Sequence, residues 1–149
     1  MRKVLAVAAL MMVLSLASAK SYMGVFSGYP EAIGVQYTMD SGMRFSIGLP
    51  VFGGFGVAGS ADMIMGSGPL GVEGLDLNYY YGAGVSAFFV NYAFLGSAVG
   101  VNGHGLLGVE WLIPDTNLGV FSEIQLGVRF DNLIGISPFY GGRFGVNFR

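Results

Sequence analysis

The chain has no cysteine and very little charge. Its 149 residues include seven basic and nine acidic residues, so only 11% are charged, against about 25% in an ordinary soluble domain. The absence of cysteine excludes disulfide frameworks and thiolate metal sites. Because Lys and Arg are not clustered, the chain also has no electrostatic footprint for nucleic acid. This number of charged groups is too small to cover the surface of a soluble domain of this size.

The sequence has only one long apolar run, and it lies at the N-terminus. Arg2 and Lys3 precede an apolar stretch over residues 4–16, which is followed by small residues at 17–19. This order of basic, apolar and small-residue segments predicts a cleaved signal peptide over residues 1–19. The run is shorter than the roughly 20 residues that a membrane-spanning helix needs. The domain expected to remain, 20–149, has five basic and nine acidic residues, a net charge of −4.

Beyond residue 19 the sequence lacks an uninterrupted apolar segment long enough to cross a membrane as a helix. All 26 glycines lie in this part, and together with polar residues they break each candidate segment. In lipid, every backbone amide must find a partner within the protein, so the alternative to spanning helices is a closed β-barrel. Little charge combined with broken apolar runs therefore predicts a membrane barrel.

A two-residue alternation between apolar and polar side chains, the period of a β-strand, recurs along this part of the chain. In the final segment Tyr140, Phe144, Val146 and Phe148 form an apolar face, and Arg143 lies on the other face. Turn residues, such as those at 40–42, separate the segments. The predicted strands are 21–28, 31–39, 43–51, 55–65, 78–90, 99–113, 118–130 and 138–149, and the irregular stretch 66–76 is predicted to be a loop into which a strand can extend.

These strands predict an all-β fold, an eight-stranded antiparallel up-and-down transmembrane β-barrel preceded by the cleaved helical signal peptide. An even number of strands places both chain ends on the same side of the membrane. A barrel of this size has an interior just wide enough for side chains to fill, which argues against a wide pore. The alternative is a soluble lipocalin-like barrel, which has an apolar interior and a polar exterior.

Three acidic and three arginine side chains fall on the polar face of the strands, where we expect them to fill the lumen and neutralise one another. A turn centred near residue 52 places Arg44 opposite Ser60 and diagonal to Asp62. A turn centred near residue 134 places Arg143 opposite Gln125 and diagonal to Glu123, which Arg143 is expected to neutralise. The predicted lumenal polar network comprises Arg44, Asp62, His104, Glu110, Glu123, Gln125, Arg129 and Arg143.

The last eleven residues, FYGGRFGVNFR, resemble the closing strand of bacterial outer-membrane β-barrels, in which an aromatic residue near the terminus is read by the assembly machinery. Phe148 holds that place here, and Arg149 follows it. As architecture, the chain after residue 19 resembles small barrels of the OmpA and OmpX type, which have a charged interior cluster. The resemblance implies a monomer in the outer membrane of a diderm bacterium. Its lipid contacts would include the face formed by Tyr140, Phe144, Val146 and Phe148.

For function, the sequence favours a non-enzymatic barrel with a structural or surface-interaction role and no catalytic residue, cofactor or metal site. His104 is the only histidine, and its surroundings lack the spacing of a catalytic triad or of a metal site. An adhesin or partner-binding barrel is the second hypothesis, although the connections expected to face outward are short. The sequence also leaves open a lipid A acyl-chain hydrolase or transferase, a narrow pore, and a soluble periplasmic lipocalin-like binder.

Overall fold

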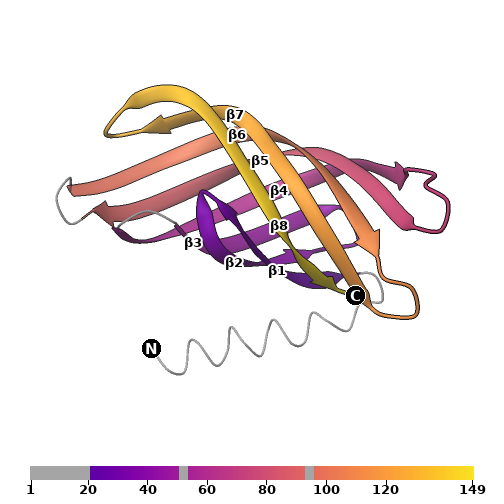
Figure 1. Cartoon of the computed structure of the whole chain (residues 1–149). Helices are drawn as coiled ribbons and strands as arrows, with labels where there is room; N and C mark the ends of the chain where they lie inside the picture. Colours follow the sequence, from indigo (N-terminus) through magenta and orange to yellow (C-terminus); the bar gives the residue numbers. More distant parts are fainter. Residues whose placement is uncertain (1–20, 51–53, 93–95) are drawn as a thin grey trace.

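The computed structural model describes residues 21–50, 54–92 and 96–149, which form one closed antiparallel barrel (Figure 1). Each strand pairs with its neighbours in sequence, and β8 pairs with β1 to close the ring. The strands are β1 (Tyr22–Tyr29), β2 (Glu31–Thr38), β3 (Met43–Pro50), β4 (Gly54–Pro69), β5 (Asp76–Tyr92), β6 (Gly96–Leu112), β7 (Leu118–Asp131) and β8 (Gly135–Phe148). The predicted all-β fold of eight antiparallel strands is confirmed. The predicted signal peptide lies outside the described residues.

The strand ends differ from the prediction mainly around residue 66. The Gly-Ser-Gly-Pro stretch favours a loop by propensity, but β4 continues through it to Pro69, with a bulge between Ile64 and Gly66. Here tertiary pairing overrides local preference, because Gly66 and Gly68 pair with Tyr81 and Tyr79 of β5. A Cβ at Gly66 would lie 2.7 Å from the Tyr81 ring, so the absence of a side chain lets the ring lie across the strand.

The barrel wall has unequal height around its circumference. Strands β1, β2 and β3 have eight residues each, whereas β4 to β8 have 14 to 17. Pairing between β1 and β8 ends at Tyr29 and Gly142, although β8 begins at Gly135. We call β1–β3 the short wall and β4–β8 the tall wall. The tip of the β1–β2 hairpin therefore stops part of the way along the tall wall (Figure 1).

The two ends of the barrel carry different side chains. At the terminal end, Arg149 donates its backbone N–H to the carbonyl of Asn117, and Ser21 donates its hydroxyl to Asp40. The acidic residues in or beside the turns of this end are all exposed: Asp40, Glu73, Asp76 and Asp115. At the opposite end, which we call the notched end, the charged residues within the described ranges are Glu31, Arg129 and Asp131, none of them exposed.

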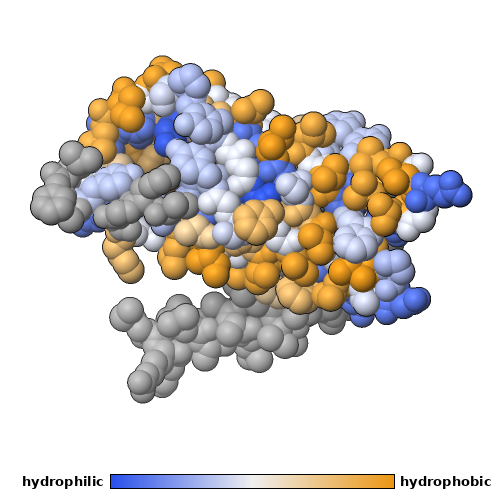
Figure 2. All heavy atoms as spheres, viewed as in Figure 1, coloured by the Kyte–Doolittle hydropathy of each residue, from blue (hydrophilic) through white to orange (hydrophobic). Residues whose placement is uncertain are grey.

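The faces of the sheet are apolar outside and polar inside. Large apolar side chains stand exposed along every strand, for example Ile33 at 61%, Val85 at 62% and Leu126 at 62%. Buried side chains include carboxylates, guanidiniums, amides and hydroxyls. Figure 2 shows apolar residues over much of the visible face, with strongly hydrophilic ones at the right-hand end near the turns of the terminal end. Within the residues that the structure covers, no helix is long and apolar enough to cross a membrane.

Candidate functional site

The middle of the barrel is closed by a buried arginine held between two carboxylates. Arg44 on β3 donates from Nε and Nη2 to Asp62 Oδ2 on β4, at 3.1 and 2.9 Å. It also donates from Nη1 and Nη2 to Glu123 on β7, at 2.7 and 3.0 Å. Because β3 and β7 are not neighbours in the ring, the Arg44–Glu123 contact crosses the lumen. All three side chains are at most 3% exposed, so the contact that crosses the lumen is shielded from bulk water.

A second ion pair lies beside the first. Arg143 on β8 donates from Nη2 to Glu31 Oε1 at 2.8 Å, and its guanidinium carbon lies 4.6 Å from the centre of the Phe26 ring. Its Nη1 is 3.9 Å from Asp62 Oδ2, which links the two ion pairs. The prediction that Arg143 neutralises Glu123 is therefore wrong. The two residues are directly opposite in register, but Arg44 takes the Glu123 carboxylate.

Glu31 was not predicted to face the lumen. Strict alternation along the second strand puts it on the same face as Ile33 and Val35, which point outward. The structure has a register shift between Glu31 and Ile33, and this irregularity turns Glu31 inward, where it is 3% exposed. A bulge reverses the facing of every residue on one side of it. The lumen thus gains a carboxylate that no two-residue pattern could reveal.

The predicted strand registers are each wrong by two residues. Arg44 pairs with Asp62 and not Ser60, and Arg143 pairs with Glu123 and not Gln125. The cause is a one-residue difference in the centre of each turn, since moving the centre by one residue shifts the pairing by two. A two-residue shift preserves the face of each side chain, so the residues still point inward.

His104 lies in the closed middle of the barrel. Its Nε2 is 3.1 Å from Asp62 Oδ1, and its ring centre is 5.8 Å from that of Phe139. Ser60 donates to the other Asp62 oxygen at 3.2 Å. The His104 side chain is fully buried, and it lines neither of the interior cavities described below. Gln125 completes this layer by donating to Glu123 at 2.7 Å.

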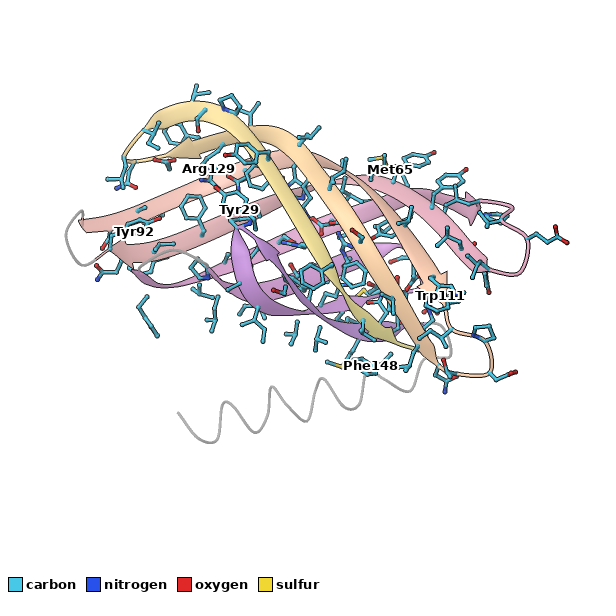
Figure 3. The ribbon with its side chains drawn as sticks, in the orientation of Figure 1. Tyr29, Met65, Tyr92, Trp111, Arg129 and Phe148 are labelled. Atoms are coloured by element: carbon cyan, nitrogen blue, oxygen red, sulfur yellow. The ribbon has the colours of Figure 1, made fainter. Side chains whose placement is uncertain are left out.

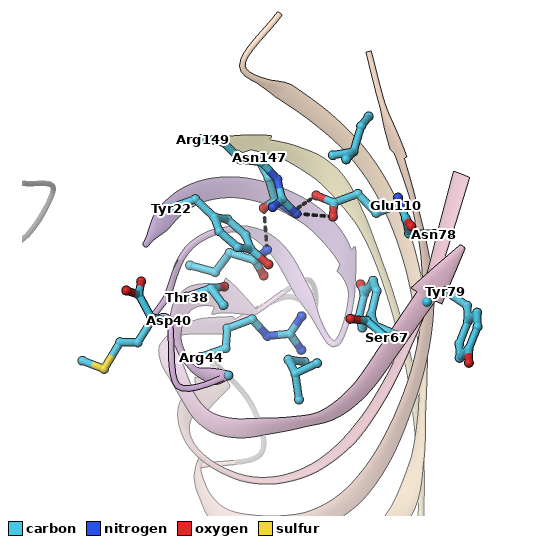
Figure 4. Close-up of a pocket in the computed structure, with 17 residues that line it drawn as sticks. Tyr22, Thr38, Asp40, Arg44, Ser67, Asn78, Tyr79, Glu110, Asn147 and Arg149 are labelled. Carbon is cyan, nitrogen blue, oxygen red and sulfur yellow. Dashed lines mark hydrogen bonds and ion pairs between the residues drawn. The ribbon is translucent and has the colours of Figure 1, made fainter. Parts of the chain in front are cut away.

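Glu110 belongs to a separate group at the mouth of the terminal end. Asn147 donates to Glu110 at 2.7 Å, Gln36 donates to Asn147 at 2.9 Å, and Arg149 pairs with the second Glu110 oxygen. These residues line a cavity of about 390 Å³ that also reaches Arg44 (Figure 4). Glu110 is thus inside the barrel, as predicted, but not in contact with the central ion pairs.

Arg129 departs most from the predicted network. It is only half-buried, and its guanidinium carbon lies 4.9 Å from the Phe88 ring centre and 5.4 Å from that of Phe139. Its Nε donates to Asn102 Oδ1 at 3.1 Å. No carboxylate of the described chain lies within ion-pair distance of it. The prediction that Arg129 helps to close the lumen by ion pairing is therefore wrong.

Glycines leave room for the large interior side chains. A Cβ on Gly84 would lie 2.1 Å from Asp62 Oδ1 on the adjacent strand, and one on Gly108 would lie 2.3 Å from the Tyr80 ring. Both distances are too short for any side chain to be tolerated without movement. The high glycine content therefore serves the filled lumen, at strand positions next to the bulkiest inward residues.

The remaining interior residues were partly visible in the sequence. Simple alternation places four more of them on the polar faces: Gln36, Tyr80, Asn102 and Asn147. The predicted network left them out because it was chosen mainly from charged residues. On the closing strand, Tyr140, Phe144 and Phe148 are 65%, 61% and 49% exposed on the outer face. Val146 shares this face and is half-buried.

The described residues form an eight-stranded antiparallel barrel whose interior is closed by ion pairs and hydrogen bonds. Among them, no group of three or more His, Cys, Asp or Glu side chains is arranged to hold a metal ion. Comparison of the chain with protein-family models, curated proteins and solved structures gave no match. Arguments about function therefore rest on the geometry of this barrel.

Proposed function

We propose that the protein is a non-enzymatic outer-membrane β-barrel protein with a side-chain-filled lumen and a structural or surface-interaction role. The observation that carries the proposal is the orientation of the two faces. Exposed Ile, Val, Leu and Phe cover the outside, and the buried Arg44, Asp62 and Glu123 occupy the inside. Lipid around the outer face would bury this apolar surface, whereas water around it would not. The same orientation argues against a lipocalin-like binder, whose faces are reversed.

The strand lengths support a membrane-spanning barrel. A tilted strand needs about 9–11 residues to cross the hydrocarbon layer. The tall wall exceeds this length with 14 to 17 residues per strand, and the short wall is close to it with eight. Closure of the ring leaves no open edge along the paired part of the wall, which a lipid environment requires.

The interior supports a non-conducting and non-enzymatic role. Arg44 and Glu123 join opposite walls, so the lumen is occupied at mid-height. His104, the base that acyl transfer would need, is fully buried and hydrogen-bonded to Asp62. A reacting lipid would have no access to its ring nitrogens.

Fractionation of expressing cells tests the location. We expect the folded protein in the outer-membrane fraction, migrating faster on a denaturing gel before heating than after it. Trp111, the only tryptophan, is 38% exposed on the outer face, so its emission should shift to shorter wavelength when the barrel inserts into vesicles. Recovery of the folded protein in the soluble periplasm would overturn the proposal.

Two further measurements test the role. Planar-bilayer recordings should show no steady current for the native protein and a measurable current for Arg143→Ala, which removes a side chain from the closed layer. The Ser21→Ala variant, changed at the surface of the terminal end, is the control and should stay silent. The mass distribution of lipid A should be the same with and without expression; an added or lost acyl chain would establish an enzyme instead.

A further inference from the structure

A small cavity lies inside the barrel at the notched end, behind the rim of the short wall. Its volume is about 70 Å³. Tyr29, Glu31 and Pro50 are among the residues that contribute from the short wall, and Phe88, Asn102 and Arg129 are among those that contribute from the tall wall. Figure 3 shows Arg129 and Tyr92 on the tall wall beyond the hairpin tip that carries Tyr29. A volume of this size holds about two water molecules or one carboxylate group.

Two charged side chains line this cavity, Glu31 and Arg129. Glu31 is paired through Oε1 with Arg143, whereas Arg129 has no carboxylate of the described chain at ion-pair distance. The one hydrogen bond that Arg129 makes to a side chain among the described residues is donated by Nε. The nearest inward acid on β7, Asp131, is occupied as an acceptor for the backbone N–H groups of Leu133 and Ile134, at 2.9 and 2.8 Å. The Phe88 and Phe139 rings both contact the guanidinium, whose carbon lies 4.9 and 5.4 Å from their centres. A guanidinium held this way, with free Nη donors, is suited to bind a planar oxyanion.

The wall beside the cavity is incomplete. β8 from Gly135 to Gly141 has no partner on the β1 side, and β4 from Gly54 to Val57 has none on the β3 side, as far as the described residues go. The side chains that surround this gap on the outside are apolar and exposed: Phe55 at 86%, Ile136 at 77% and Tyr140 at 65%. An entry lined by apolar groups outside and by a cation inside matches a molecule with an apolar chain and an anionic head.

We propose that the notched end binds a long-chain fatty acid, with its carboxylate on Arg129 and its chain passing over the rim onto the apolar outer surface. The placement of the chain rests on the proposed membrane location. The small volume favours a single carboxylate over a bulky lipid head group. Pairing with a carboxylate would compensate the one interior guanidinium that the described chain itself leaves unpaired.

Native mass spectrometry of the full-length barrel, released from a non-ionic detergent, can count bound molecules. We expect one palmitate per barrel, and at least tenfold weaker binding to Arg129→Gln. Arg149→Gln removes the same charge at the opposite end and is the matched control, so it should bind palmitate as the native protein does. Hexadecanol, which has the same chain without the charge, should bind the native protein as weakly as palmitate binds Arg129→Gln.

Competition separates the possible sources of the anion. Acetate and inorganic phosphate, which lack the chain, should not displace palmitate at equal concentration, and phosphatidylglycerol should displace it poorly. Equal competition by phosphate or by phosphatidylglycerol would overturn the fatty-acid assignment, as would equal binding of hexadecanol and palmitate. If Arg129→Gln does not fold, Arg129→Lys and the hexadecanol comparison on the native protein still decide the matter. Palmitate binding through Arg129 in a protein that fractionates with the periplasm would refute the membrane location and leave the site intact.

Discussion

The middle of the barrel and its notched end hold arginines in opposite circumstances. Arg44 is 3% exposed and makes four hydrogen bonds to two carboxylates on different strands. Arg129 is half-buried between two aromatic rings, with one hydrogen bond to an amide. The difference shows that one lumen contains both a region whose charges satisfy each other and a region whose charge remains available.

Arg44→Met should have the largest effect, because it leaves Asp62 and Glu123 buried with less compensation. Removing one partner of a buried ion pair costs about 3–5 kcal/mol. The free energy of unfolding, measured by urea titration in lipid vesicles with Trp111 fluorescence and gel mobility, should fall by this amount. Arg129→Met should change it by less than about 1 kcal/mol, since no ion pair is lost. Equal losses of stability from the two substitutions would contradict the proposal that Arg44 is ion-paired and Arg129 is not.

Gly84→Ala should come next. Its new Cβ would lie 2.1 Å from Asp62 Oδ1 and 2.9 Å from the Ala61 carbonyl oxygen, so the central layer must shift. Overpacking of this kind costs about 1–3 kcal/mol in the same unfolding assay. Gly103→Ala is the control, because a Cβ on Gly103, which lies on the outer face, would meet no atom within 4 Å. Stability should be unchanged or raised there; a loss as large as at Gly84 would contradict the packing argument.

Asp131→Ala tests a smaller effect at the notched end. The Asp131 carboxylate accepts two backbone N–H groups that start the turn between β7 and β8. Losing these bonds should cost about 1–2 kcal/mol and should increase amide hydrogen exchange at Leu133 and Ile134. Glu73→Ala, in an exposed turn of the terminal end, should leave stability unchanged. If Arg129 were in fact neutralised by Asp131, this substitution would also strengthen palmitate binding.

Arg149→Gln should have the smallest effect. Its guanidinium pairs with Glu110 but is 40% exposed, and exposed pairs contribute about 0–1 kcal/mol. The difference in unfolding free energy from the native protein should stay below about 1 kcal/mol and shrink further in about 1 M salt, where the Debye length is only about 3 Å. A loss comparable to that of Arg44→Met would mean that the mouth, and not the middle, holds the interior together.

The sequence predicted the strand number and the facing of nearly all side chains. Two-residue alternation determines facing wherever a strand is regular, and this is why Arg44, Asp62, Glu123 and Arg143 were all predicted to point inward. Alternation does not determine register, because the centre of a turn can move by one residue without a visible signal. Alternation therefore gives the direction of Arg44 and Arg143 but does not identify the residues they pair with.

Three features could not be located from local patterns: the bulge at Glu31, the end of β4 and the isolation of Arg129. The bulge that turns Glu31 inward depends on pairing with β3, and the extension of β4 to Pro69 depends on tyrosines of β5. The isolation of Arg129 likewise depends on the position of Asp131 and its turn. Each is a consequence of contacts between strands, which a single strand's composition does not encode.

The Arg44–Glu123 contact has a consequence for assembly. The two residues are 79 positions apart in the chain, and they meet only when β3 and β7 belong to the same ring. Until then Arg44 can use Asp62 alone, so an incompletely closed sheet carries an exposed or unbalanced Glu123. A contact of such long sequence separation forms late and slows folding. The Arg44–Glu123 contact thus stabilises only the ring that has closed in the correct register. A barrel that closes with a strand missing or slipped lacks this contact and keeps an unpaired Glu123.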